Sequence, residues 1–311
     1  MDDPMRFKIP GYVAALIIGL GTQCTSAADA VSAESIVHVT AVQPTHRLVK
    51  TAQVELAYGD TVGTVGFEPA GRDRQAVGPS AFDVDGQGHY VVADPVRHRL
   101  VRLQQRSGVS VATPLGALPL PFSDLAVDRD GWIYLTDLRS RTLTTVAPST
   151  TSRAPLPGKG LSTRFVRQGD DVVLSAGASS RLLRRGVLTQ LASNVSVEKC
   201  NAEAGLITMA PGGKQIQVEL GGPLASIRLI GVNRAGDIFV IVERFVQRGR
   251  LAVNRHVLVL AATGALKAQL QVLGKPAIHP VREFVLGPRG ALHRMVPGTQ
   301  GVAFLRWEVR P

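Results

Sequence analysis

The sequence predicts an all-β fold built from repeated, four-stranded antiparallel sheets, and two observations support this prediction. First, short apolar runs are separated by turns, and the 311-residue chain contains 32 Gly and 19 Pro. Turn residues this frequent leave little room for long helices. Second, one strand–turn–strand pattern recurs at fixed spacing, which is typical of repeat architectures. A single large repeat domain is therefore expected.

Two copies of the pattern align without a gap. They are residues 82–94 (FDVDGQGHYVVAD) and residues 125–137 (LAVDRDGWIYLTD). Each copy has a short strand, a turn closed by glycine and an apolar strand that ends in Asp. Asp and Gly tolerate the positive φ angles of tight turns, so we expect Asp128, Asp130 and Gly131 to reverse the chain. Both copies are therefore predicted to be β-hairpins.

Four further segments extend the repeat along the chain. Residues 230–239 and 284–293 keep the offset of the closing glycine, whereas residues 165–174 and 199–209 are degenerate copies. Additional strand-like runs follow the hairpins and bring each repeat to about four strands. The repeats predict a six-bladed arrangement of four-stranded antiparallel blades, although five or seven blades would also fit.

The copy at residues 82–94 carries the clearest sequence signature. Asp94 closes its second strand and Arg99 follows at a short offset, with Arg97 where Asn is usual. This pattern resembles the NHL repeat of β-propellers. The resemblance implies a six-bladed β-propeller over residues 51–311.

The two ends of this region are expected to close one blade together. Residues 53–56 form an alternating strand pattern, as do residues 302–307 near the C-terminus. Pairing them would close the ring and remove exposed sheet edges. The residues before this region, 29–50, are expected to be a linker or an extra strand, since Ile36–Val39 has strand character.

The N-terminus has the layout of a signal peptide, predicted to span residues 1–28. Arg6 and Lys8 precede an apolar stretch at residues 11–20, and small residues follow at 25–30. The apolar stretch is about half the length of a membrane span, so no span is expected after cleavage. An uncleaved anchor is the alternative. The predicted location is secreted or periplasmic.

No strong catalytic motif occurs, so candidate site residues are taken from the repeat. Residues just before each inner strand of a propeller tend to face the central channel or its mouth, where function usually collects. By the repeat alignment, the candidate ligand-binding residues are Ser80, Ser123, Asp124, Arg228, Arg282 and Glu283.

Two kinds of ligand would suit these residues. Arg228 and Arg282 could hold a carboxylate or phosphate by paired hydrogen bonds. Asp124, Glu283 and Asn233 could instead offer hard oxygen ligands to Ca²⁺. A purely structural alternative is that these charges pair with one another and line a solvated channel.

The charge points to an anionic partner. Lys and Arg outnumber Asp and Glu by 35 to 24, a net charge of +11. With 5% aromatic residues there are few platforms for stacking bases, and export also disfavours nucleic acid. We expect a monomer that binds a protein or an anionic polymer of the cell envelope.

The expected function is therefore a binding scaffold that acts through its loops and channel mouth, without a cofactor. The NHL resemblance implies an alternative. Secreted propellers similar to this one include gluconolactonase-like enzymes and streptogramin lyases. By that resemblance, the alternative is a metal-dependent lactonase or lyase with its site at the central channel.

Overall fold

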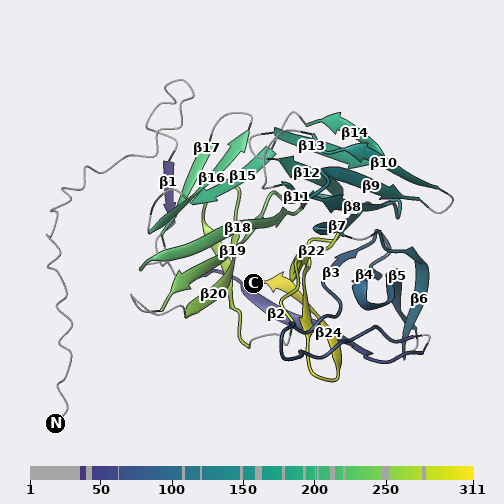
Figure 1. Cartoon of the computed structure of the whole chain (residues 1–311). Coiled ribbons are helices and arrows are strands. Elements are labelled where there is room, and N and C mark those ends of the chain that lie inside the picture. Colours follow the sequence, from purple (N-terminus) through teal and green to yellow (C-terminus); the bar gives the residue numbers. More distant parts are fainter. Residues whose placement is uncertain are drawn as a thin grey trace, which may run out of the picture. The chain divides into compact units, whose positions relative to one another are not determined.

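The computed structural model describes most of the chain after the predicted signal peptide (Figure 1). The described residues are 36–39, 44–61, 63–106, 109–119, 121–147, 150–157, 163–176, 179–191, 194–199, 201, 203–210, 214–219, 222–246, 252–274 and 278–311. The predicted signal peptide, residues 1–28, lies outside them. No helix among these residues is long and apolar enough to cross a membrane.

The first two sheets along the chain contain the two best copies of the repeat. Both are antiparallel and four-stranded, in the orders β3-β4-β5-β6 and β10-β9-β8-β7. The first sheet consists of β3 (Ala81–Val84), β4 (Tyr90–Asp94), the 3-10 turn η2 (Pro95–Arg97), β5 (Arg99–Arg106) and β6 (Val109–Ala117). The second consists of β7 (Asp124–Val127), β8 (Ile133–Asp137), β9 (Thr142–Val146) and β10 (Thr151–Pro155).

An eight-stranded sheet follows, made of two antiparallel halves. Its first half contains β11 (Thr163–Gln168), β12 (Asp171–Ala176), β13 (Ser179–Arg184) and β14 (Val187–Gln190). Its second half contains β18 (Leu224–Val232), β19 (Ile238–Phe245), β20 (Val253–Leu260) and β21 (Leu266–Gln271). Parallel pairing of Arg167 with Gly231 and of Gln168 with Val232 joins the halves through β11 and β18.

The remaining two sheets each take in a strand from the N-terminal part of the described chain. One contains β15 (Asn194–Lys199), β16 (Ala204–Ala210), β17 (Lys214–Glu219) and β1 (Ile36–Val39), which pairs in parallel with β17. The other contains β22 (Phe284–Leu286), β23 (Leu292–Pro297), β24 (Gly301–Arg310) and β2 (Arg47–Ala57). The predicted pairing of the chain ends is confirmed, because Val54 lies opposite Phe304 and Leu56 opposite Val302.

The hairpin turns use aspartate differently from the sequence prediction. Gly131 has φ +85°, but Asp128 and Asp130 are not among the residues with positive φ. Instead, Asp128 Oδ1 accepts hydrogen bonds from the backbone N–H groups of Asp130 and Trp132, at 2.9 Å each. The aspartate therefore fixes the turn through its side chain, and the glycine alone supplies the left-handed backbone.

The first strands of five four-stranded units contact one another in a closed order. β3 contacts β7, β7 contacts β11, β11 contacts β18, β18 contacts β22, and β22 contacts β3. The β15 sheet contacts β18, but β11 and β18 pair directly, so β15 does not separate them. Apolar layers fill the spaces between neighbouring sheets, for example Phe82, Tyr90 and Phe304 between the β3 and β22 sheets. These layers position the starts and ends of the short inner strands.

Candidate ligand-binding pocket at the starts of the inner strands

A pocket of about 170 Å³ lies where three inner strands begin, beside the middle of a fourth. It is lined by the first residues of β7, β11 and β22 or their neighbours, and by the middle of β18. The repeat explains this convergence. Asp124, Arg164, Leu229 and Glu283 each directly precede the first apolar residue of their repeat copy, and all four line the pocket.

Asp124 and Arg282 form a buried ion pair at one side of the pocket. Arg282 Nη1 donates to both carboxylate oxygens, at 3.1 and 3.0 Å, and to the carbonyl of Phe165 at 3.0 Å. Asp124 also accepts from the backbone N–H of Leu125 and, across the sheets, from that of Phe165. Burial alone would lower the pKa of Arg282, but the charges of Asp124 and Asp83 raise it. The pair therefore ties β7 to β11.

Glu283 is likewise held by arginines. Its carboxylate accepts from Arg255 Nη2 at 2.6 Å and from Arg294 Nε at 2.7 Å. Arg255 also donates to Glu243 at 3.0 Å. Burial acts to lower the pKa of Arg255, while its bond and charge interaction with Glu283 raise it above its ordinary value. Both pocket carboxylates thus have cationic partners within the protein.

Arg164 differs from the other pocket charges. Among the residues that the structure describes, its guanidinium has neither a hydrogen bond nor an ion pair. Burial lowers the pKa of Arg164, the positive charge of Arg228 lowers it further and that of Arg282 adds to this, whereas Asp124 opposes them. A partly buried cation beside two other cations lacks the compensation that buried charges normally have.

Arg228 is the most exposed of the three pocket arginines. Its side chain is 47% exposed, and its nearest carboxylate oxygen, Oε1 of Glu243, lies 4.0 Å away. The same oxygen already accepts the 3.0 Å bond from Arg255. Arg228 therefore retains most of its donors for another acceptor.

Most of the predicted site residues come together in this pocket. Ser123, Asp124, Arg228, Arg282 and Glu283 all line it. Ser123 Oγ accepts from the backbone N–H of Leu138 at 3.0 Å.

The other two predicted residues lie differently. Ser80 does not line this pocket; its carbonyl accepts from the backbone N–H of Arg282 at 3.3 Å, and its own N–H donates to the carbonyl of Ala93. Asn233 lines a separate pocket and its amide donates to Asp237 at 3.0 Å. The structure therefore does not bring Asp124, Glu283 and Asn233 together as one ligand set. Within the described ranges, no three His, Cys, Asp or Glu side chains group closely enough to hold a metal ion.

Sequence reasoning missed Arg164 and its neighbour Thr163. Both line the pocket, and they directly precede the degenerate copy at residues 165–174. The signal was present, because the offset that selected Asp124 and Glu283 selects Arg164 when it is applied to this weaker copy. The repeat offset could not identify Arg255 and Arg294, because they come from β20 and β23 rather than from an inner strand.

A second aspartate–arginine pair lies deeper between the inner strands. Arg167 Nη2 donates to Asp83 Oδ2 at 3.3 Å and to the carbonyls of Val84 and Val127 at 3.1 and 2.8 Å. Asp83 Oδ2 also accepts from the backbone N–H of Val127. Both side chains are 2% exposed. This pair repeats the inter-strand bonding of Asp124 and Arg282 without bordering that pocket.

Comparison with known proteins supports the fold. A member of the DUF4221 family from Bacteroides vulgatus has a TM-score of 0.52 at 9% identity, covering 86% of this chain and 99% of that chain. The fold is a β-propeller. Its sheets are built from four-stranded units that are antiparallel apart from the pairings of β1 with β17 and of β11 with β18.

Two further propeller structures are similar at lower scores. A streptogramin B lyase has a TM-score of 0.44 at 11% identity, covering 83% of this chain and 98% of that chain. A gluconolactonase from Xanthomonas campestris has a TM-score of 0.39 at 12% identity, covering 84% and 100%. The chain is thus distantly similar to propellers of these kinds. No protein-family model and no curated protein sequence matches the chain.

Proposed function

We propose that this β-propeller is an exported binding protein whose inner-strand pocket holds an anionic group, a carboxylate or a phosphate, of its ligand. The blade number that we propose is six, with the eight-stranded sheet as two blades and the β15 sheet as a sixth outside the ring of contacts that the other five units close. Residues 1–28 are the proposed signal peptide. The ligand group would be presented by a protein or an anionic polymer of the cell envelope, in keeping with the net charge of +11.

One observation carries this proposal, the unbalanced positive charge of the pocket. Asp124 and Glu283 are already bonded to Arg282 and to Arg255 and Arg294. Arg164 adds a positive charge to the lining without an ion pair among the described residues, and Arg228 adds another whose nearest carboxylate oxygen, on Glu243 at 4.0 Å, already binds Arg255. An anion bound between them would supply the missing compensation and accept charge-assisted hydrogen bonds.

Calorimetric titration of the mature protein with inorganic phosphate and with short dicarboxylates tests the proposal. We expect saturable binding that weakens at high salt, because the attraction is electrostatic. Arg164→Ala and Arg228→Ala should each weaken binding by about tenfold, the usual loss for one charge-assisted bond.

The matched control is Arg234→Ala, which removes an exposed arginine that pairs with Asp170 away from this pocket. This variant should bind both anions as the wild type does. Equal affinity in Arg164→Ala, Arg228→Ala and the control would overturn the proposal. So would the absence of saturable binding of either anion.

A metal-dependent lactonase or lyase is the alternative function. It would require Asp124 and Glu283 to give up their arginine partners for a cation such as Ca²⁺, so the observed ion pairs favour the anion-binding function. Thermal unfolding with and without Ca²⁺ separates the two. The binding proposal predicts an unchanged midpoint, whereas stabilisation that is lost in Asp124→Asn would support the metal site.

A further inference from the structure

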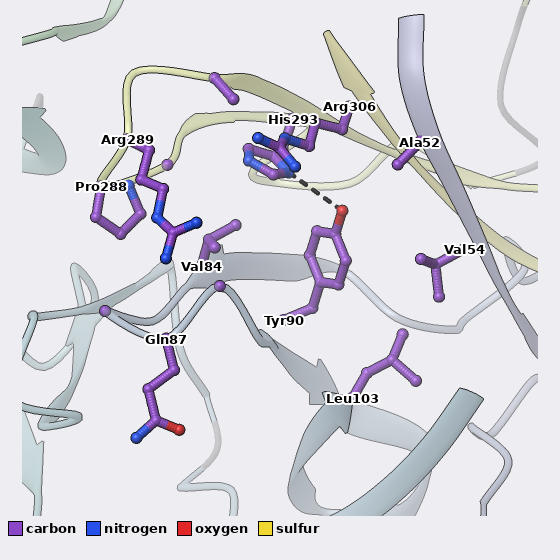
Figure 2. A pocket seen from close by; sticks show the side chains of 14 residues that line it. Ala52, Val54, Val84, Gln87, Tyr90, Leu103, Pro288, Arg289, His293 and Arg306 are labelled. Carbon is purple, nitrogen blue, oxygen red and sulfur yellow. Dashed lines mark hydrogen bonds between the residues drawn. The ribbon is translucent and has the colours of Figure 1, made fainter. Parts of the chain in front are cut away.

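A second pocket, of about 200 Å³, lies at the opposite end of β22 from the first pocket and beside the end of β3 (Figure 2). The first pocket, which is proposed above to bind an anion and is called the anion pocket from here on, is lined by Glu283 and Phe284, where β22 begins. The second pocket is lined by Gly287 and Pro288, just after β22 ends. It opens between the β3–β4 turn and the β22–β23 turn. The two pockets share no lining residue.

One wall of the second pocket is apolar. Val54, Val84 and Leu103 line it, together with the ring of Tyr90. The Tyr90 ring is fixed by stacking on Phe304, with centroids 4.7 Å apart and an interplanar angle of 30°. A rigid apolar wall of this kind suits a hydrocarbon or aromatic body rather than a sugar or an inorganic ion.

The polar end of the pocket is a tyrosine–histidine pair. Tyr90 Oη and His293 Nδ1 lie 3.1 Å apart, and Figure 2 shows the Tyr90 hydroxyl pointing at the imidazole. Burial raises the pKa of Tyr90 to about 12. Burial, with the charges of Arg306 and Arg167, lowers the pKa of His293 to about 3. Both groups are therefore neutral at pH 7.

This pair has one hydrogen-bond donor more than it uses. The neutral pair carries two polar protons, one on the hydroxyl and one on the ring, and the bond between them uses only one. If Tyr90 donates, His293 Nε2 keeps its proton; if His293 donates, the hydroxyl proton is left over. No other hydrogen bond to either group occurs among the described residues. In either tautomer, one donor remains for an acceptor on a ligand.

His293 lines the pocket although it is only 6% exposed, and glycine at position 287 puts no side chain over its Nε2. A Cβ at Gly287 would lie 2.7 Å from His293 Nε2, so a larger residue there would block this nitrogen. Two arginines supply positive charge at the same end. Arg289 is exposed, with no ion pair in the part of the chain that the structure describes, and Arg306 pairs with Glu308 at 2.7 Å. In Figure 2, Arg289 and Arg306 lie on either side of His293.

We propose that this second pocket binds a small monocarboxylate with an apolar body, such as a short fatty acid or an aromatic acid. The hydrocarbon lies against Val54, Val84 and Leu103. The carboxylate accepts the spare donor of the Tyr90–His293 pair and faces the positive charge of Arg289. This site is separate from the anion pocket of the proposed function.

Calorimetric titration with hexanoate and with benzoate tests this proposal, with 1-hexanol as the uncharged probe. Both acids should bind saturably, one per chain, and hexanol at least tenfold more weakly, since it lacks the charge that Arg289 faces. The double variant Tyr90→Phe with His293→Leu keeps the stacked ring but removes both polar protons of the pair, and should weaken both acids about fivefold to tenfold. Arg289→Ala, at an exposed position, should weaken them by a similar factor.

Three control variants separate this site from the other pocket. Arg164→Ala and Arg228→Ala should leave hexanoate binding unchanged, as should Arg185→Ala, an exposed arginine paired with Asp130 elsewhere. Loss of hexanoate binding in Arg164→Ala would place the acid in the anion pocket and overturn the inference. Unchanged binding in both the Tyr90→Phe/His293→Leu double variant and Arg289→Ala would do the same, as would no saturable binding by the wild type.

Discussion

Two aspartate–arginine pairs tie the inner strands of this propeller together, and they differ in what surrounds them. In each pair the carboxylate accepts from a backbone N–H of the next sheet, Val127 for Asp83 and Phe165 for Asp124. The Asp83–Arg167 pair is sealed among strands. The Asp124–Arg282 pair borders a pocket that also contains Arg164 and Arg228.

We infer that this bonding pattern serves structure alone in the first pair, whereas the second pair also borders the proposed binding pocket. The Nη atoms of Arg167 donate to Asp83 and to three backbone carbonyls, those of Val84, Val127 and Asp170, while its Nε is buried with no hydrogen-bond partner among the described residues. The side chain of Arg167 is 2% exposed, so a ligand cannot reach it. Around Arg282, the guanidiniums of Arg164 and Arg228 add positive charge to the pocket lining, and the proposed anion binding rests on this surplus.

Breaking the sealed pair should have the largest effect on stability. Arg167→Met leaves the Asp83 carboxylate buried without a cation, and we expect a loss of about 3–5 kcal/mol in the free energy of unfolding. Urea denaturation followed by circular dichroism measures it. Asp83→Asn combined with Arg167→Met should recover part of the loss. A single variant as stable as the wild type would show that the pair does not tie the sheets.

Breaking the Asp124–Arg282 pair should reduce the free energy of unfolding by less, and it should also alter phosphate binding. Asp124→Asn keeps the size of the side chain but removes the charge that Arg282 faces, so we expect a loss of about 2–3 kcal/mol in the same denaturation experiment. Arg282 then joins Arg164 and Arg228 as an uncompensated cation, and phosphate affinity should rise. If phosphate affinity fell in this variant, the carboxylate itself would be part of the binding set.

Acid should destabilise the protein through His293, which lies close enough to Arg167 for that charge to lower its pKa. The folded-state pKa is about 3, below the ordinary value of 6.5, so the unfolded state takes up the proton first. The contribution of neutral His293 to the free energy of unfolding is complete above pH 6.5 and is lost as the pH falls toward 3. Once the unfolded state is protonated, the loss is about 1.4 kcal/mol for each pH unit.

His293→Gln removes this proton uptake and serves as the comparison. The variant should be less stable than the wild type at pH 7, with the gap between them narrowing as the pH falls. Denaturation curves at several pH values measure the gap. A constant gap from pH 7 to pH 4 would mean that His293 is protonated in the folded state as readily as in the unfolded state.

Removing an exposed pair should have the smallest effect. Arg185 is bonded to Asp130 on the surface, and such pairs contribute little in water. Arg185→Ala should unfold at the same temperature as the wild type in a thermal scan and should bind phosphate equally well. A clear drop in the unfolding temperature or in phosphate affinity would show that this surface ion pair contributes to stability or to binding.

Much of the fold could be predicted because the turn chemistry fixes the repeat. The offset from the closing glycine located the hairpins, and it also placed Asp124 and Glu283 at the starts of inner strands. Their partners could not be predicted in the same way. Arg255 and Arg294 reach Glu283 from neighbouring strands of two sheets, and no local pattern encodes that convergence.

Asn233 and Arg164 show two ways in which prediction from the repeat offset is incomplete: the first residue was wrongly assigned to the site, and the second was left out. Asn233 belongs to the hairpin turn, where its side chain accepts from the backbone N–H of Asp237, so an oxygen donor in the repeat need not face the channel. Arg164 faces the pocket although its repeat copy is degenerate. Position in the repeat therefore predicted the site better than residue chemistry did.

A crystal structure of the mature protein soaked in selenate, an anomalous scatterer with the shape and charge of a tetrahedral oxyanion, tests the central claim most directly. The surplus positive charge predicts an anomalous peak between the guanidiniums of Arg164 and Arg228, and its loss in Arg164→Ala crystals. Peaks confined to exposed arginines such as Arg185 and Arg234, with none in the pocket, would contradict it.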